Sequence, residues 1–367
     1  MELRTGDLDA FHAVPREAYG SDTRYVSPLR ADFARMLDAK RNPTFAPGDL
    51  AWWTAHRDGR PVGRIVASVH ERSNELHGTS RCQFGFFDCV DDEEVAAALL
   101  GQVEGFARER GLGEVAGNFN LTAMQQIGVM TDGFENDPFI DQIYSPPHVH
   151  RLLEGAGYER FFPMTTFVAD LTGMDPEHAL GPKQRELLAD PGFSWAPVTR
   201  RTIEPRLEEA RTILNDSFEG NPMFVPLSRE EYMFQAADLK WVIDPRISAV
   251  LKHDGVPVGA TICIPDANPL LRAMGSRIGL AAPWHYLRHR PTNRRLVLIY
   301  TGVASDWQGR GVGPLLLHRV ASSARAAGYT SMGGTWIADV NAASLGQLHR
   351  VGAKPLHRLH LYRKALA

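Results

Sequence analysis

Cysteine is scarce in this sequence of 367 residues, which contains only Cys82, Cys89 and Cys263. The number is odd and no pair has CxxC spacing, so the pattern favours a reducing compartment over a disulfide framework or a cysteine-bound metal. The sequence also lacks the run of ~18 apolar residues that would span a bilayer. Its first residues lack the basic and apolar segments of a signal peptide. We therefore expect a cytoplasmic protein.

The sequence also lacks an excess of charge of one sign. Lys and Arg total 40 and Asp and Glu total 43, which gives a formal charge of -3. A surface built to coat a polyanion is thereby disfavoured, and we expect neither nucleic acid nor a membrane as a partner. The length exceeds that of one ordinary hydrophobic core, so the starting expectation is two domains.

Short motifs recur along the chain. Residues 58–63 (DGRPVG) return at 254–259 as DGVPVG, and in both places a tight Asp-Gly turn followed by a β-branched run predicts a hairpin. An Ala-Arg-x-x-Gly motif at 107–111, typical of a helix that ends at a glycine, returns at 324–328.

A third pair of similar segments follows in the same order. Residues 152–158 and 348–353 are both amphipathic, and each segment precedes a predicted final strand. Each half then reads β–β–β–α–β–α–β, with helices packed on a mixed sheet, and loop insertions explain the changing spacing. Two unrelated α/β domains that share common turn signals are the alternative. We predict domains at 1–172 and 206–367, joined by a proline-containing linker at 173–205.

The second half contains a strand, a glycine turn and a helix in succession. An apolar run at 296–303 predicts a buried strand, residues 308–313 (QGRGVG) form the turn, and Pro314 suits the first turn of a helix. Glycines permit close backbone approach, and a helix N-terminus attracts anions, so this segment predicts a phosphate or pyrophosphate cradle. It has neither the Walker pattern nor the dinucleotide pattern.

The Gln-x-x-Gly-x-Gly turn behind a bulged strand, together with the block from Trp336 through Asn341 to Gly352, resembles the GCN5-related N-acetyltransferases (GNAT). The resemblance is specific over 249–367 and weaker over 51–170. It implies an α/β (α+β mixed sheet) protein made of two tandem acyl-CoA N-acyltransferase folds. It also implies acetyl-CoA as co-substrate and direct attack of an amine on the thioester. No residue pattern in the sequence has the spacing of metal ligands, so we expect no metal.

The same resemblance assigns cofactor-binding roles in the second half. The turn amides would hold the CoA pyrophosphate, the strand backbone at 299–303 would hydrogen-bond the pantetheine, and an asparagine in the next block would contact the pantetheine arm. The residues implied are Thr301, Val303, Gln308, Gly309, Arg310, Gly311, Val312, Gly313 and Asn341.

The catalytic groups depart from the family pattern. Many members have a proton-donating tyrosine where this sequence has Leu348. Tyr300 and Ser344 are therefore the preferred candidate acids here, with His349 a weaker candidate, and water is the alternative proton donor. Asp339 is a candidate general base, and the alternative for it is a cap of the following helix.

Acceptor contacts are predicted at Glu219, Asn221 and Trp336, with a solvated loop as the alternative for the first two. The long segment 118–147 suits a lid or an acceptor pocket, or else a structural cover. The arginines of 288–295 could meet the CoA 3′-phosphate or an acidic acceptor, or simply lie in a solvated loop.

Acidic residues replace the glycine cradle in the first half. The residues that align with 308–311 of the glycine turn are Asp91, Asp92, Glu93 and Glu94. These acids would repel a pyrophosphate, so we predict that this half binds no CoA. The sequence thus predicts an acetyl-CoA-dependent N-acetyltransferase acting on a small-molecule or peptide amine, and it is compatible with a homodimer. The alternatives are an aminoacyl or long-chain acyl transferase on the same fold, or a non-catalytic CoA-binding protein.

Overall fold

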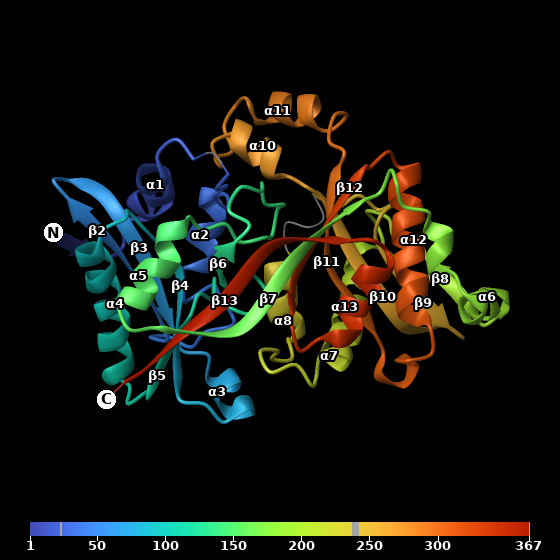
Figure 1. The fold of residues 1–367 in the computed structure, drawn as a ribbon, viewed down its shortest axis with the longest axis horizontal. Coiled ribbons are helices and arrows are strands. Elements are labelled where there is room, and N and C mark those ends of the chain that lie inside the picture. The colour runs from blue at the N-terminus through green and yellow to red at the C-terminus, as the bar shows by residue number, and fades with distance from the viewer. Residues whose placement is uncertain (23, 237–241, 367) are drawn as a thin grey trace.

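The computed structural model describes residues 1–22, 24–236 and 242–366, and the strands of this part form one continuous mixed sheet (Figure 1). The strand order is β1-β2-β3-β4-β5-β13-β7-β12-β11-β10-β9-β8, with β6 paired beside β13. Only β4–β5 and β11–β12 among the described pairs are parallel.

The N-terminal half supplies strands β1 to β7 and helices α1 to α5. Their bounds are β1 Glu2–Arg4, α1 Leu8–Tyr19, α2 Arg30–Met36, β2 Leu50–Arg57, β3 Arg60–Ser68, α3 Glu71–His77, β4 Arg81–Cys89, α4 Glu93–Arg108, β5 Glu114–Gly117, β6 Val129–Asp132, α5 Pro147–Gly155 and β7 Glu159–Asp170.

The C-terminal half supplies the remaining elements. Their bounds are η1 Pro176–Ala179, α6 Pro182–Ala189, β8 Phe193–Ala196, α7 Ile203–Ser217, α8 Arg229–Gln235, β9 Ala249–His253, β10 Val256–Pro265, α10 Asn268–Ala273, α11 Ala282–His289, β11 Arg295–Val303, η2 Ser305–Trp307, α12 Val312–Ala326, β12 Ser331–Ala338, α13 Ala342–Arg350 and β13 Lys354–Ala365.

The repeat predicted from sequence is confirmed in three dimensions. Both Asp-Gly pairs have positive φ at each residue, as a two-residue type I′ hairpin requires. Gly63 and Gly259 follow the two hairpins, and each lies directly under the helix of its own half. A Cβ on Gly63 would stand 2.6 Å from Leu99 of α4, and one on Gly259 would stand 3.0 Å from Leu316 of α12. The same strand-to-helix approach therefore occurs twice.

The two halves are interlocked through their last strands. Strand β13 of the second half lies between β5 and β7 of the first, with Tyr362 opposite Gly117. Strand β7 of the first half in turn pairs with β12 of the second. Each half thus completes its sheet with the final strand of the other, and Figure 1 shows β7 and β13 crossing side by side between the two lobes.

The predicted domain boundaries remain a prediction, but the structure adds detail to the stretch assigned to a linker. Residues 173–205 contain η1, α6 and β8, and β8 pairs antiparallel with β9 at the end of the sheet. Helix α6 lies against the glycine turn of the second half, as described below.

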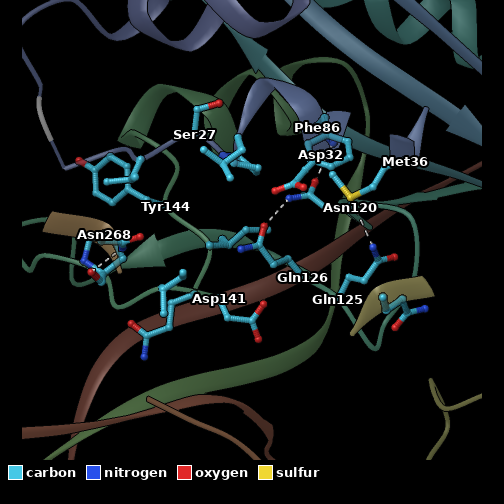
Figure 2. Close-up of a pocket in the computed structure, with 18 of the residues that line it drawn as sticks. Ser27, Asp32, Met36, Phe86, Asn120, Gln125, Gln126, Asp141, Tyr144 and Asn268 are labelled. Carbon is cyan, nitrogen blue, oxygen red and sulfur yellow. Dashed lines mark hydrogen bonds between the residues drawn. The ribbon is translucent and has the colours of Figure 1, made fainter. Parts of the chain in front are cut away.

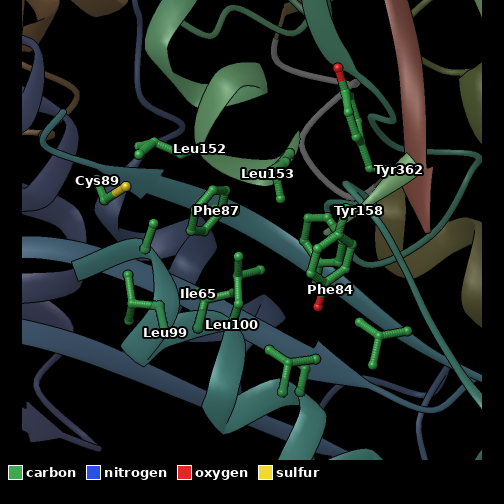
Figure 3. Close-up of a cluster of buried hydrophobic side chains, with 14 of the residues drawn as sticks. Ile65, Phe84, Phe87, Cys89, Leu99, Leu100, Leu152, Leu153, Tyr158 and Tyr362 are labelled. Carbon is green, nitrogen blue, oxygen red and sulfur yellow. The ribbon is translucent and has the colours of Figure 1, made fainter. Parts of the chain in front are cut away.

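The core of the first half shows what the strand exchange contributes (Figure 3). Leu99 and Leu100 of α4 and Leu153 of α5 pack against Phe84 of β4, and all four are essentially inaccessible to solvent. Tyr362, which comes from β13, is equally buried in this cluster and donates a hydrogen bond to Glu154 at 2.9 Å. The C-terminal strand is therefore part of the N-terminal core.

Candidate functional site

The glycine turn of the second half has the geometry of an anion cradle. Gly309 and Gly311 have φ of 70° and 98°, and Gly311 caps helix α12, which begins at Val312. Among the described residues, the backbone N–H groups of Gly309, Gly311, Val312 and Gly313 have no hydrogen-bond acceptor. Unpaired amides at the positive end of a helix are well placed to bind a pyrophosphate.

Helix α6 closes over one side of this turn. Lys183 Nζ donates to the Gly309 carbonyl at 2.8 Å, and Gln184 Nε2 donates to the Gly311 carbonyl at 3.3 Å. A Cβ on Gly311 would lie 2.8 Å from Gln184 Nε2. A side chain at position 311 would thus fill the cradle, and Lys183 adds a cation that the sequence reasoning missed because it lies in the presumed linker.

Strands β11 and β12 separate beside the turn. They pair from Arg295 to Leu298 only, the last pair being Leu298 with Gly334, although both strands continue. A bulge at Ile299 accompanies the separation, because Tyr300 pairs with Ile262 while Leu298 pairs with Cys263. The gap agrees with the pantetheine slot that the GNAT resemblance implies.

Some of the polar groups predicted to bind pantetheine already have hydrogen-bond partners within the chain. The Val303 amide donates to Ser217 Oγ at 3.3 Å, and the Val303 carbonyl accepts from Gln308 Nε2 at 3.3 Å. The Thr301 hydroxyl lies 3.2 Å from that of Thr261. Arg310 stacks over Trp307 at 5.3 Å on the exposed side of the turn.

The corresponding places in the first half are occupied by its own side chains. Asp92 caps α4 by accepting from the amides of Glu94 and Val95 at 2.9 and 3.1 Å, and it pairs with Arg57 at 2.7 Å. The slot beside β4 is closed as well, because a Cβ on Gly85 would lie only 1.6 Å from the Phe119 carbonyl oxygen.

Tyr300, a predicted acid, lies on the wall of a cavity. Its hydroxyl is buried without a hydrogen-bond partner among the described residues, and its ring lies 6.5 Å from that of Tyr232. Ser344 lies in the first turn of α13, where its amide donates to Asn341 Oδ1 at 3.1 Å. Asn341, predicted to contact pantetheine, is therefore the helix cap.

Asp339, the predicted base, lies in a bidentate ion pair with Arg358 at 2.7 and 2.6 Å. The guanidinium lowers the pKa of Asp339, which makes this carboxylate a weaker proton acceptor. Its assignment as a base remains a prediction.

The predicted acceptor contacts lie apart from the cavity. Glu219 is exposed, Asn221 Oδ1 accepts from the Met223 amide at 3.0 Å, and Trp336 packs on Phe162 at a ring distance of 6.2 Å. None of the three predicted residues is among the cavity-lining side chains of the described chain.

A cavity of about 380 Å³ lies between the two halves (Figure 2). Its wall combines the segment that follows α1, the segment 118–145, helix α8, the start of α10 and residues Ile299 and Tyr300 of β11. Many of the lining side chains are apolar, including Met36, Phe86, Ile140, Leu227 and Phe234. The segment 118–147, predicted as a lid or pocket, therefore forms a cavity wall.

One lining carboxylate differs from its neighbours. Asp88 pairs with Arg64 at 2.6 Å and Asp32 pairs with Arg35 at 3.7 Å. Asp141 has no hydrogen-bond or ion-pair partner among the described residues, and its φ is 68°. Figure 2 shows it among the side chains that line the cavity. Loss of water around the side chain raises the pKa of Asp141 to about 8.

Sequence reasoning missed Asp141, and its only signal was its place in the unusually long polar and aromatic segment. The described residues contain no cluster of three His, Cys, Asp or Glu side chains suited to a metal ion. None of the described helices combines the length and the apolar composition that a membrane span requires.

Comparison with known proteins places these features in context. Residues 207–353 match the acetyltransferase (GNAT) family. Protein YghO of Escherichia coli is 25% identical over 99% of this chain and 94% of its own length. The bacterial ceramide synthase of Caulobacter vibrioides is 26% identical over 98% of this chain and 95% of its own length.

Solved structures share the fold over the whole chain. A tandem GNAT protein from the clavulanic acid biosynthesis pathway is 15% identical, with a TM-score of 0.58 over 99% of this chain and 98% of that one. A GCN5-related N-acetyltransferase from Sphaerobacter thermophilus is 14% identical, with a TM-score of 0.56 over 99% and 95%.

Proposed function

We propose that this chain, which belongs to the GNAT superfamily as a tandem protein, transfers an acyl group from a CoA thioester to the primary amine of an acceptor with a long apolar chain. The cavity carries the proposal. An acetyl group fills only a small part of about 380 Å³, and the apolar lining suits hydrocarbon. A full-length relative is named a bacterial ceramide synthase, and a ceramide is an amide of a long-chain amino alcohol.

The second half supplies the donor site. The free amides at Gly309, Gly311 and Gly313 and the gap between β11 and β12 suit the pyrophosphate and pantetheine of an acyl-CoA. Tyr300 extends from the same strand into the cavity wall, so the thioester end of the gap and the acceptor cavity meet at β11.

The cavity also supplies the proton chemistry. An alkylamine enters as an ammonium ion and must lose a proton before its nitrogen attacks the thioester carbon. The Asp141 carboxylate would attract the ammonium and accept this proton. The nitrogen then attacks the thioester carbon, the C–N bond forms and the C–S bond breaks. The Tyr300 hydroxyl would protonate the departing thiolate, and the tyrosinate would take up the second proton that the nitrogen loses as the amide forms. Asp141 would then release its proton to solvent.

A product matrix tests the proposal. Acetyl-, octanoyl- and palmitoyl-CoA are each combined with sphinganine, hexadecylamine, glucosamine and a lysine peptide, and amides are measured by mass spectrometry. We expect amide formation with the two long-chain amines and little with the sugar or the peptide. Turnover of the sugar or peptide amine without the long-chain amines would overturn the proposed acceptor class, and binding of CoA without any amide would favour a non-catalytic protein.

A further inference from the structure

The connection between β10 and β11 exposes an unusual apolar surface. It carries the helices α10 and α11, which project from the body of the molecule (Figure 1). Ten large hydrophobic residues of the described chain are exposed, and five of them lie here. They are Ile278 (71% exposed), Leu280 (105%), Trp284 (59%), Tyr286 (37%) and Leu287 (70%).

Helix α11 has its apolar side chains on the outside. The positions that repeat with helical spacing and are partly buried are Ala282, His285 and His289, whereas Trp284 and Leu287 face solvent. A helix that stabilised only its own domain would have the opposite orientation. A cluster of this kind on a soluble surface marks a contact with another apolar phase.

Beyond Asp266, its first residue, the charged side chains of the same connection are all positive. From Ala267 to Ser305 there is no Asp or Glu, in a chain whose formal charge is -3. The basic residues of this stretch are Arg272, Arg277, Arg288, Arg290, Arg294 and Arg295. Arg295 pairs with Asp266 at 2.8 Å and Arg277 lies 3.6 Å from Asp9, but Arg288 and Arg290 are exposed beside Trp284 and Tyr286.

We infer that this surface, formed by Ile278, Leu280, Trp284, Tyr286, Leu287, Arg288 and Arg290, docks the protein on an anionic lipid membrane. Trp and Tyr favour the membrane–water interface, and neighbouring arginines bind anionic headgroups. A symmetric contact between two copies would instead bring these arginines together without any carboxylate from the same stretch. This inference replaces the expectation of no membrane partner. That expectation is based on the formal charge of the whole chain, and the absence of a spanning segment does not concern contact with a membrane face.

The docking surface is continuous with the acceptor cavity. Ala267, Asn268 and Leu271, at the base of the projection, line the cavity. Ser276 Oγ donates to the Ser27 carbonyl at 2.6 Å, and Ser27 lines the cavity from the other half. A lipid held at the membrane surface would therefore be close to the wall of the cavity that accommodates hydrocarbon.

Vesicle binding by the full chain tests this inference without any turnover, so its outcome is independent of the proposed reaction. Flotation is measured with phosphatidylcholine vesicles that either contain or lack phosphatidylglycerol, at low and high salt. We expect binding to the anionic vesicles that weakens with salt. The double variants W284S/L287S and R288E/R290E should each lower the partition coefficient about tenfold or more.

Matched variants elsewhere control for surface changes. Leu76→Ser removes a leucine of α3 that is 56% exposed, and R200E/R201E reverses two exposed arginines of the C-terminal half. Both should bind vesicles as the unaltered protein does. Absence of binding by the unaltered protein, or equal binding by all variants, would overturn the inference. A dimer in solution that W284S/L287S converts to a monomer, without vesicle binding, would overturn it in favour of a contact between copies.

Discussion

Asn120 Oδ1 accepts a hydrogen bond from the Phe86 amide at 2.8 Å, and this contact lies where the second half has the gap between β11 and β12. Strand register makes Phe86 the counterpart of Tyr300, since Phe84 pairs with Gly117 as Leu298 pairs with Gly334. In the second half the corresponding gap lies open beside β11. The first half thus fills with its own amide side chain the space that the second offers to a ligand.

One CoA per chain is therefore expected in calorimetric titration of the full protein. Asn120→Ala should not create a second site, because Asp92 still occupies the helix N-terminus. It should lower the free energy of unfolding by ~1–3 kcal/mol, since the buried Phe86 amide loses its acceptor. Asn221→Ala, in a loop, is the control and should cost ~0.5 kcal/mol or less. A stoichiometry of two would contradict this account of the first half.

The glycine cradle is tested at Gly311. Gly311→Glu places a side chain where φ is 98° and Gln184 is 2.8 Å from the new Cβ, and it adds a negative charge beside the pyrophosphate. We expect CoA affinity to fall about 100-fold or more, which corresponds to ~2.7 kcal/mol. Gly101→Glu, on α4 with no atom within 4 Å of its Cβ, should bind CoA normally. Unchanged affinity in Gly311→Glu would show that the pyrophosphate binds elsewhere.

Local patterns predicted much of this fold. The Asp-Gly hairpins, the glycine turn and the helix-ending glycines are encoded by nearby residues, so the repeat and the geometry of the glycine turn could be predicted from sequence. The exchange of β7 and β13 could not be found in this way. Strand β13 alternates between buried and partly exposed residues whereas β7 has a continuous buried run, and neither pattern specifies which half provides the neighbouring strand.

The cavity was only partly predictable for a related reason. Its wall combines segments that are hundreds of residues apart, such as Ser27 and Tyr300. The length of segment 118–147 is typical of a segment with a functional role. Which of its polar residues has unusual chemistry depends on the surroundings of each side chain in the folded chain. Asp141 becomes distinctive only because the folded chain removes water from it and supplies no partner. The sequence predicts Asp339 as the base, and only the folded chain shows that Arg358 pairs with this carboxylate at 2.6 Å.

The pH dependence of catalysis should depend on Asp141. Because the pKa of Asp141 is raised to about 8, the free enzyme holds this carboxyl largely protonated at pH 7, and kcat/KM should rise until about pH 8. Asp141→Asn should lower kcat/KM about 10²–10⁴-fold and keep only the pH dependence of the acceptor's ammonium group. Asp339→Asn should stay within about twofold. An unchanged profile in Asp141→Asn would exclude the proposed base.

Asp141 should also affect stability, with a definite sign. Its folded pKa lies above the unfolded one, so the folded state retains the proton more strongly and loses stability as pH rises from about 4 to 8. The Asp141→Asn variant lacks this loss and should therefore be more stable than the unaltered protein at pH 8. We expect a difference of ~2 kcal/mol in the free energy of unfolding, because water in the cavity screens the carboxylate. Urea unfolding at several pH values measures the difference, which should shrink toward pH 4.

The proposed proton donor can be separated from a structural tyrosine. Tyr300 and Tyr232 both have buried hydroxyls without a partner among the described residues, and their rings are neighbours, but only Tyr300 lies on β11 beside the donor gap. Removing either hydroxyl should leave stability unchanged or slightly raised, because an unpaired buried hydroxyl costs free energy. Tyr300→Phe should lower kcat about 10²-fold with little change in KM, whereas Tyr232→Phe should retain kcat. Equal kcat values in the two variants would assign thiolate protonation to Ser344 or to water, and Ser344→Ala distinguishes these two.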